Sequence, residues 1–221
     1  MTGSTIVGRI VKAIAWLLLS LVTIGNSAVG ESTESDQRAA WVPPAYPLVA
    51  CDPYFSIWSQ GKAIVDCDTT HWTGKPHRLV SIIRVNGRAY RLLGNTPSQL
   101  PSFVQVSQQV SPTRSQFVLS GAGVEVKLTF TTPALPHSID ILARPITYVS
   151  YEFRATDGKS HDVQLIFAAS GEVAVDSPDQ PVVAESVPQN GDTILRVGSE
   201  EQIILGRHGD DLRIDWGYFY L

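Results

Sequence analysis

The chain has 221 residues, of which 43% are hydrophobic and only 17% are charged, so it is long enough to bury the core of one or two domains. Its 17 Lys and Arg stand against 21 Asp and Glu, and this acidic balance argues against a nucleic-acid binder, which needs a basic footprint. Two cysteines are too few for a disulfide-built scaffold, which leaves an ordinary globular protein.

The first thirty residues have the three parts of a secretory signal peptide. Arg9 and Lys12 precede an apolar stretch over residues 13–24, and small residues follow it up to Gly30. The apolar stretch is about a dozen residues long, whereas a membrane-spanning helix needs roughly 20. We therefore predict that residues 1–30 are a signal peptide and that the protein is exported, to the periplasm or the extracellular space. An uncleaved single-span anchor is the alternative.

Residues 31–46 are predicted to form a flexible or extended linker. The stretch up to residue 40 is polar and short-chained, which is typical of an unstructured lead. Pro43, Pro44 and Pro47 then bias the residues before them away from helix, so the end of this segment is extended.

From residue 47 onward the sequence alternates with the period of two that is typical of half-buried strands. Asn86-Gly87 separates two apolar runs and is the strongest short hairpin signal, because both turn residues must accept a positive φ. Strands are predicted over residues 79–85, 88–93, 103–110, 115–120, 124–130, 147–154, 163–169, 182–187, 193–197, 202–205 and 212–220. We predict an all-β fold of the β-sandwich or supersandwich type, with one segment over residues 47–112 and a β-sandwich domain over residues 113–221.

The last eight residues are rich in aromatic side chains and carry no polar tail. Because an exposed aromatic strand is prone to edge pairing, we expect the domain to continue in a longer parent protein. A buried terminal strand is the alternative.

The sequence offers few groups for chemistry. Cys51 and Cys67 could form a disulfide in an exported protein or remain two separate buried thiols. His71 and His77 lie six residues apart, which matches no common metal-ligand spacing, and a histidine beside Trp72 is more often a packed, hydrogen-bonded residue. We therefore expect neither a metal nor a cofactor.

Residues 52–59 combine Asp52 with three aromatic side chains, one of which is Trp58. Aromatic faces supply contact area and one carboxylate supplies orientation, so such a set suits a sugar or an amide-bearing ligand. The same set also suits a surface that packs against another domain.

Several blocks together resemble the secreted glutaminase A-like family. They are residues 47–59, 70–75, 83–94, 128–133, 143–148, 157–163 and 215–218, and they appear in the family's order from about residue 43 to the end. The resemblance implies an exported protein with an N-terminal β-sandwich region, followed by a larger α-helical toroid, and hydrolysis of L-glutamine to L-glutamate and ammonia. The architecture also resembles glycoside hydrolases that join a β-supersandwich to a helical barrel.

The resemblance covers the β part of the family only, so no catalytic residue is carried over to this sequence. The leading hypothesis is a non-catalytic N-terminal region whose partner is the helical catalytic domain. Asp52, Trp58, His71 and Trp72 are then candidates for the rim of the catalytic cleft, where glutamine or a glycan would bind. The alternatives are a free-standing β-sandwich module that binds glycans or peptides, and a fragment without activity.

Overall fold

The computed structural model describes residues 42–221. The predicted signal peptide and residues 31–41 of the predicted linker lie outside this range. No helix within residues 42–221 has the length and apolar character needed to cross a membrane.

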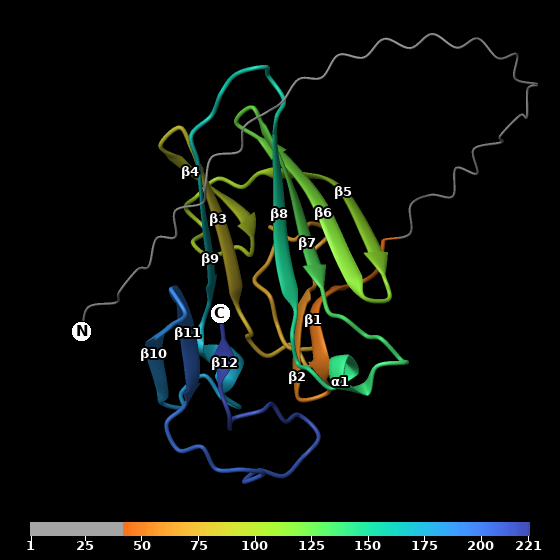
Figure 1. Ribbon diagram of the computed structural model, residues 1–221, viewed down its shortest axis with the longest axis vertical. Coiled ribbons are helices and arrows are strands. Elements are labelled where there is room, and N and C mark those ends of the chain that lie inside the picture. Colours follow the sequence, from red (N-terminus) through yellow and green to blue (C-terminus); the bar gives the residue numbers. More distant parts are fainter. Residues whose placement is uncertain (1–41) are drawn as a thin grey trace, which may run out of the picture.

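The regular secondary structure of the described residues consists almost entirely of antiparallel strands, which confirms the all-β prediction (Figure 1). The strands form four sheets. One is the pair β1 (Tyr46–Asp52) and β2 (Phe55–Ser59), and another has the order β4 (Arg88–Leu93), β3 (Leu79–Val85), β9 (Val163–Ala169). The largest has the order β5 (Val104–Ser111), β6 (Arg114–Gly121), β7 (Val124–Thr131), β8 (Tyr148–Ala155). The last has the order β10 (Val182–Gln189), β11 (Asp192–Ser199), β12 (Phe219–Tyr220). Two short helical turns, α1 (Ile139–Leu142) and the 3-10 turn η1 (Gly171–Ala174), complete the elements.

The hairpin predicted at Asn86-Gly87 is confirmed by its turn geometry, and a second Asn-Gly turn has the same geometry. Asn86 and Gly87 between β3 and β4 have φ angles of 49° and 87°, and Asn190 and Gly191 between β10 and β11 have 51° and 89°. Asn and Gly accept this left-handed backbone at little cost, which is why the sequence signal is reliable here.

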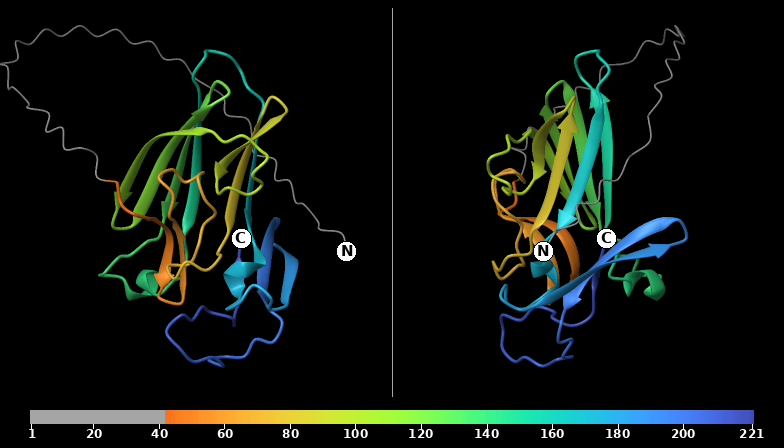
Figure 2. Two further views of the ribbon diagram at one scale, coloured as in Figure 1. Left: turned by 180° about the vertical axis from the view of Figure 1, so that it is seen from behind. Right: turned by 90° about the vertical axis from the view of Figure 1, so that its left-hand side faces the viewer.

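The core lies between the β4–β3–β9 sheet and the β5–β6–β7–β8 sheet, which Figure 2 shows as two layers. Ile83 from β3, Phe117 from β6, and Val126 and Leu128 from β7 belong to one buried apolar cluster. The Ser81 hydroxyl of β3 and the Tyr151 hydroxyl of β8 are hydrogen-bonded across the layers at 2.8 Å. The predicted sandwich-type packing is therefore present.

β8 and β9 follow one another in the chain but belong to different sheets. β8 pairs with β7, and β9 pairs with β3, so the loop that contains Gly158 crosses from one layer to the other. Each of the two strands has one edge without a strand partner among the described residues. The sandwich is consequently open along this side.

The predicted strands over residues 202–205 and 212–220 are wrong, apart from β12 at Phe219–Tyr220. Gln202 and Leu205 have φ angles of 51° and 53°, which interrupt an extended strand. The segment between β11 and β12 is instead held by side-chain contacts, which are described below.

Candidate functional site

Asp52 closes the turn between β1 and β2. One oxygen of its carboxylate accepts hydrogen bonds from the backbone N–H groups of Tyr54 at 2.7 Å and Phe55 at 2.9 Å. An aspartate in this arrangement fixes backbone geometry, as Asx-turns do. Asp52 therefore shapes the hairpin that carries the other predicted residues.

His71 and Trp72 converge on a single backbone carbonyl in this hairpin. The indole N–H of Trp72 donates to the Pro53 carbonyl at 2.7 Å, and Nε2 of His71 lies 3.1 Å from the same oxygen. Since a carbonyl can only accept, Nε2 of His71 carries the hydrogen, and Nδ1 accepts from the Thr73 hydroxyl at 3.0 Å. Both nitrogens of His71 are thus engaged, and burial lowers its pKa.

The structure brings Asp52, His71 and Trp72 together at the β1–β2 turn, whereas Trp58 makes its polar contact elsewhere. Its indole N–H donates to the Ser56 hydroxyl at 3.0 Å, and its backbone pairs with Thr70. The side chain of Trp72 is 54% exposed, while that of Trp58 is half-buried. Trp72 alone of these two presents a large aromatic face to solvent.

A second imidazole and a guanidinium lie beside His71. The ring of His77 is 5.1 Å from that of His71, and its Nδ1 donates to the Ser56 carbonyl at 3.1 Å. Nε2 of His77 and Nε of Arg213 are buried without a hydrogen-bond partner. Burial, together with the neighbouring His71 and Arg213, lowers the pKa of His77 to about 4, so this imidazole is neutral at pH 7.

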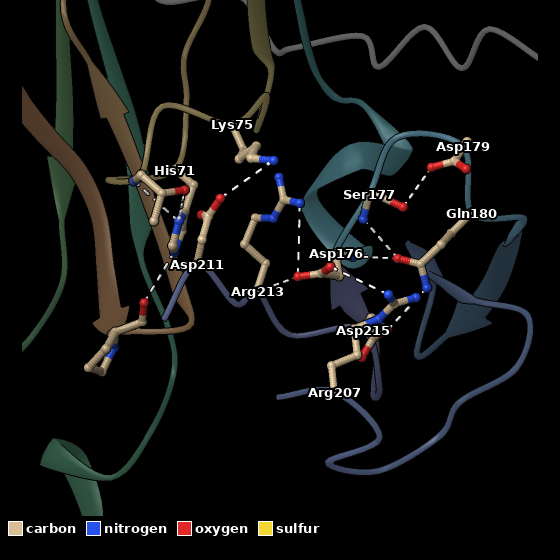
Figure 3. Close-up of polar contacts among 12 residues, drawn as sticks. His71, Lys75, Asp176, Ser177, Asp179, Gln180, Arg207, Asp211, Arg213 and Asp215 are labelled. Carbon is tan, nitrogen blue, oxygen red and sulfur yellow. Dashed lines mark hydrogen bonds and ion pairs between the residues drawn. The ribbon is translucent and has the colours of Figure 1, made fainter. Parts of the chain in front are cut away.

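Arg213 stands at the centre of a polar network that we call the polar junction (Figure 3). The junction comprises His71, Lys75, Asp176, Gln180, Arg207, Asp211, Arg213 and Asp215. These residues come from three segments: the β2–β3 loop, the turn after η1 and the β11–β12 segment. They are far apart in the sequence, and the fold alone brings them together.

Carboxylates hold the arginines of the junction. Asp176 accepts a hydrogen bond from the backbone N–H of Arg213 at 3.0 Å and lies 3.9 Å from its guanidinium. Asp215 accepts from Nε of Arg207 at 2.7 Å and from the Gln180 amide at 3.1 Å. The β11–β12 segment is thereby fastened to the turn after η1.

Lys75 and Asp211 extend the junction to the β2–β3 loop. Their side chains form an ion pair at 3.5 Å, and a hydrogen bond from Thr73 together with the charge of Lys75 lowers the pKa of Asp211. Both side chains are about half exposed, so this pair adds little stability. This ion pair joins the β11–β12 segment to the β2–β3 loop, which carries the predicted residues His71 and Trp72.

The disulfide considered for Cys51 and Cys67 is not formed, since both cysteines are free thiols in the structure. Burial and, to a smaller extent, the charge of Asp52 raise the pKa of Cys51 to about 11. A thiol with such a pKa stays protonated at neutral pH, and the thiolate is the nucleophilic form. Cys51 is therefore not an activated nucleophile.

A cleft of about 670 Å³, which we call the apolar cleft, opens beside the β1–β2 hairpin. Its lining includes Val49, Phe55, Val149, Phe167, Trp216 and Phe219, which come from β1, β2, β8, β9 and the C-terminal segment. The cleft could not be predicted from the sequence, because the β1–β2 hairpin, the β8–β9 region and the C-terminal segment are remote from one another in the chain.

The polar side chains at the apolar cleft already have partners or carry no charge. The Asp52 carboxylate accepts two backbone N–H groups, and the Thr147 hydroxyl is bonded to that of Thr132 at 2.7 Å. Cys51 is a protonated thiol. The cleft is therefore suited to contact with apolar surface rather than to acid–base or nucleophilic chemistry.

The fold and this arrangement of side chains define a sandwich-type β protein that carries a polar junction built from three segments and an open apolar cleft. Two family models match the chain: Domain of unknown function (DUF4964) over residues 18–105, and Domain of unknown function (DUF5127) over residues 113–221. No solved structure gives a significant match.

The sequence is also similar to that of glutaminase A from Aspergillus oryzae (strain ATCC 42149 / RIB 40). The two are 28% identical over 213 residues, which cover 91% of this chain and 30% of the relative. These matches confirm the resemblance to the N-terminal region of the glutaminase A-like family. The chain spans less than a third of the relative's length.

Proposed function

We propose that this chain is the exported, non-catalytic N-terminal β region of a glutaminase A-like protein, in which it braces a helical catalytic domain. The parent activity would be the hydrolysis of L-glutamine to L-glutamate and ammonia. The observation that carries the proposal is the coverage, because 91% of the chain corresponds to 30% of glutaminase A.

The engagement of the candidate side chains supports a bracing role. Asp52 holds a turn, both nitrogens of His71 are hydrogen-bonded, and Trp72 donates to the Pro53 carbonyl. A general base needs a free lone pair within reach of a substrate proton, and a nucleophile needs an adjacent base. These three side chains are occupied in holding the β1–β2 turn.

An ammonia assay tests the non-catalytic part of the proposal. The purified 221-residue chain is incubated with L-glutamine, and ammonia is measured against a heat-denatured sample of the same preparation. We expect equal ammonia in both samples. Ammonia release that scales with the concentration of folded chain would contradict the proposal.

A second candidate function is a glycan-binding module, and one observation favours it. Tyr54 follows Pro53 in the chain, Trp72 is bonded to the Pro53 carbonyl, and both aromatic side chains are exposed. Aromatic faces of this kind can stack on sugar rings. This function predicts glycan binding that is lost in Trp72→Ala and retained in Trp58→Ala, since the Trp58 indole is half-buried and bonded to Ser56. Equal binding by both variants, or none by the unaltered chain, would remove this candidate.

A further inference from the structure

We propose that the apolar cleft is the docking site for an extended apolar strand from the part of a glutaminase A-like protein that this chain does not match. The inference rests on the proposed bracing function and names the surface that performs it. It follows from two features of the cleft: its exposed apolar rim and the free strand edges beside it.

Large apolar side chains stand exposed around the rim. Ile146 is 42% exposed and Leu221 is 40% exposed, and both line the cleft. Tyr218 and Tyr220 are exposed on the same lining. A contiguous apolar surface of this kind marks an interaction site, because leaving it in water forfeits the free energy of burial.

Two strands offer unpaired backbone groups at the cleft. Within residues 42–221, β8 is bonded to β7 on one side only, and β12 is bonded to β11 on one side only. Val149 from β8 and Phe219 from β12 both line the cleft. An extended segment that lies along either strand can satisfy its free edge by main-chain hydrogen bonds while its side chains fill the apolar space.

The rest of a glutaminase A-like protein is the occupant that the observations favour. Glutaminase A of A. oryzae has 70% of its length outside the matched part. A small polar ligand is less suited, because most of the side chains that line the cleft are apolar.

A binding measurement with charged variants tests the docking surface. The unmatched part of A. oryzae glutaminase A is produced as a separate polypeptide, and its binding to the 221-residue chain is measured by calorimetry. Ile146→Glu and Leu221→Glu place a carboxylate at the rim, where a docked strand would bury it without a partner. We expect each variant to weaken binding by roughly tenfold or more.

Val104→Glu and Val106→Glu are the matched controls. Both valines are exposed on β5, which is the edge of the β5–β6–β7–β8 sheet opposite to β8. Like the two rim substitutions, each control replaces an exposed aliphatic side chain by a carboxylate. We expect binding by these controls to equal that of the unaltered chain. The thermal unfolding temperature of all four variants is measured alongside, so that loss of binding is separated from loss of fold.

Each other outcome overturns the inference. Equal binding by all variants would place the contact on another surface and leave the bracing function standing. Absence of binding by the unaltered chain would overturn the inference and the bracing function together, while the ammonia assay would still decide the non-catalytic part separately. Self-association that Ile146→Glu abolishes, detected by analytical ultracentrifugation, would make a second copy of the chain the occupant.

Discussion

Two neighbouring strands of the largest sheet differ sharply in burial. Val126 and Leu128 on β7 are fully buried, whereas their cross-strand partners on β8, Phe153 and Tyr151, are 39% exposed and half-buried respectively. Residues directly opposite in an antiparallel pair point to the same face, so the four side chains form one apolar surface. The β7 part of that surface is fully covered, whereas the β8 part is covered only in part.

The opposing sheet shows the same change in burial. Ile83 on β3 is fully buried, and its partner Leu165 on β9 is only half-buried. The core is therefore complete between β3 and β7 and incomplete between β8 and β9. Apolar residues on the open side are placed as they would be in a covered strand, as the docking proposal requires.

The largest expected difference in stability is between truncation of a side chain on the packed β3–β7 side and truncation of one on the open β8–β9 side. Phe117→Ala removes a fully buried ring and should lower the free energy of unfolding by about 3–5 kcal/mol. Phe153→Ala removes a ring that is already exposed and should cost about 1 kcal/mol or less. Urea unfolding measures the free energy of unfolding of both variants. Similar losses of unfolding free energy in the two variants would contradict the division into a packed and an open side.

A second prediction concerns His77, which is neutral and buried beside His71 and Arg213. Its pKa in the folded state is about 4, below the ordinary value of 6.5, so the unfolded chain binds the proton more tightly. The contribution of His77 to the free energy of unfolding is fully present above about pH 6.5 and is lost as the pH drops toward 4. The total loss is about 3 kcal/mol. Urea unfolding at pH 7.5 and pH 4.5 measures the loss.

His77→Asn should reduce that pH dependence, since the amide does not titrate. The control is His137→Asn, which replaces an exposed histidine and should leave the dependence unchanged. If His77→Asn and the unaltered chain lost the same free energy on acidification, the acid sensitivity would have another source.

A smaller effect is expected from the polar junction. Asp176→Ala removes the acceptor of the Arg213 backbone N–H and the carboxylate nearest to its buried guanidinium, and should cost about 2 kcal/mol. Asp179→Ala, an exposed position on the same turn, should change stability by about 0.5 kcal/mol or less. Chemical denaturation compares the two variants, and an equally small cost for both would mean that the junction does not fasten the β11–β12 segment.

The smallest effect on stability is expected at the cleft rim. Ile146→Glu alters a side chain that contacts water in the isolated chain, so its unfolding free energy should change by about 0.5 kcal/mol or less. Differential scanning calorimetry measures this change. A large loss would mean that Ile146 supports the fold itself and that the rim is not free for a partner.

Much of the fold could be predicted because its signals are local. Asn86-Gly87 and Asn190-Gly191 define their hairpins through the φ angles that these residues accept, and alternation defines the strands between them. The error at residues 202–205 has a physical cause. An apolar run there resembles a strand, but Gln202 and Leu205 adopt a left-handed backbone. Backbone conformation at such positions is set by tertiary contacts, including those of the Gln202 amide with Ser199 and Gly217.

The candidate site could be predicted only in part. Asp52, His71 and Trp72 come from two short motifs, and the structure places them at one turn. The role of Arg213 could not be predicted from the sequence, because Arg213 is more than a hundred residues away from the two histidines in the chain and becomes their neighbour only in the folded protein. The apolar cleft was missed for the same reason. Contacts between remote segments are not encoded in any local pattern of residue types.

Amide hydrogen exchange of the chain, alone and with the unmatched part of A. oryzae glutaminase A, separates the packed side from the open side. We expect β3, β6 and β7 to be protected in both samples, and the partner to add protection to β8 and to residues 216–221, with none added to β5. Added protection on β5 and none at the cleft, or no change anywhere on the chain, would contradict this expectation.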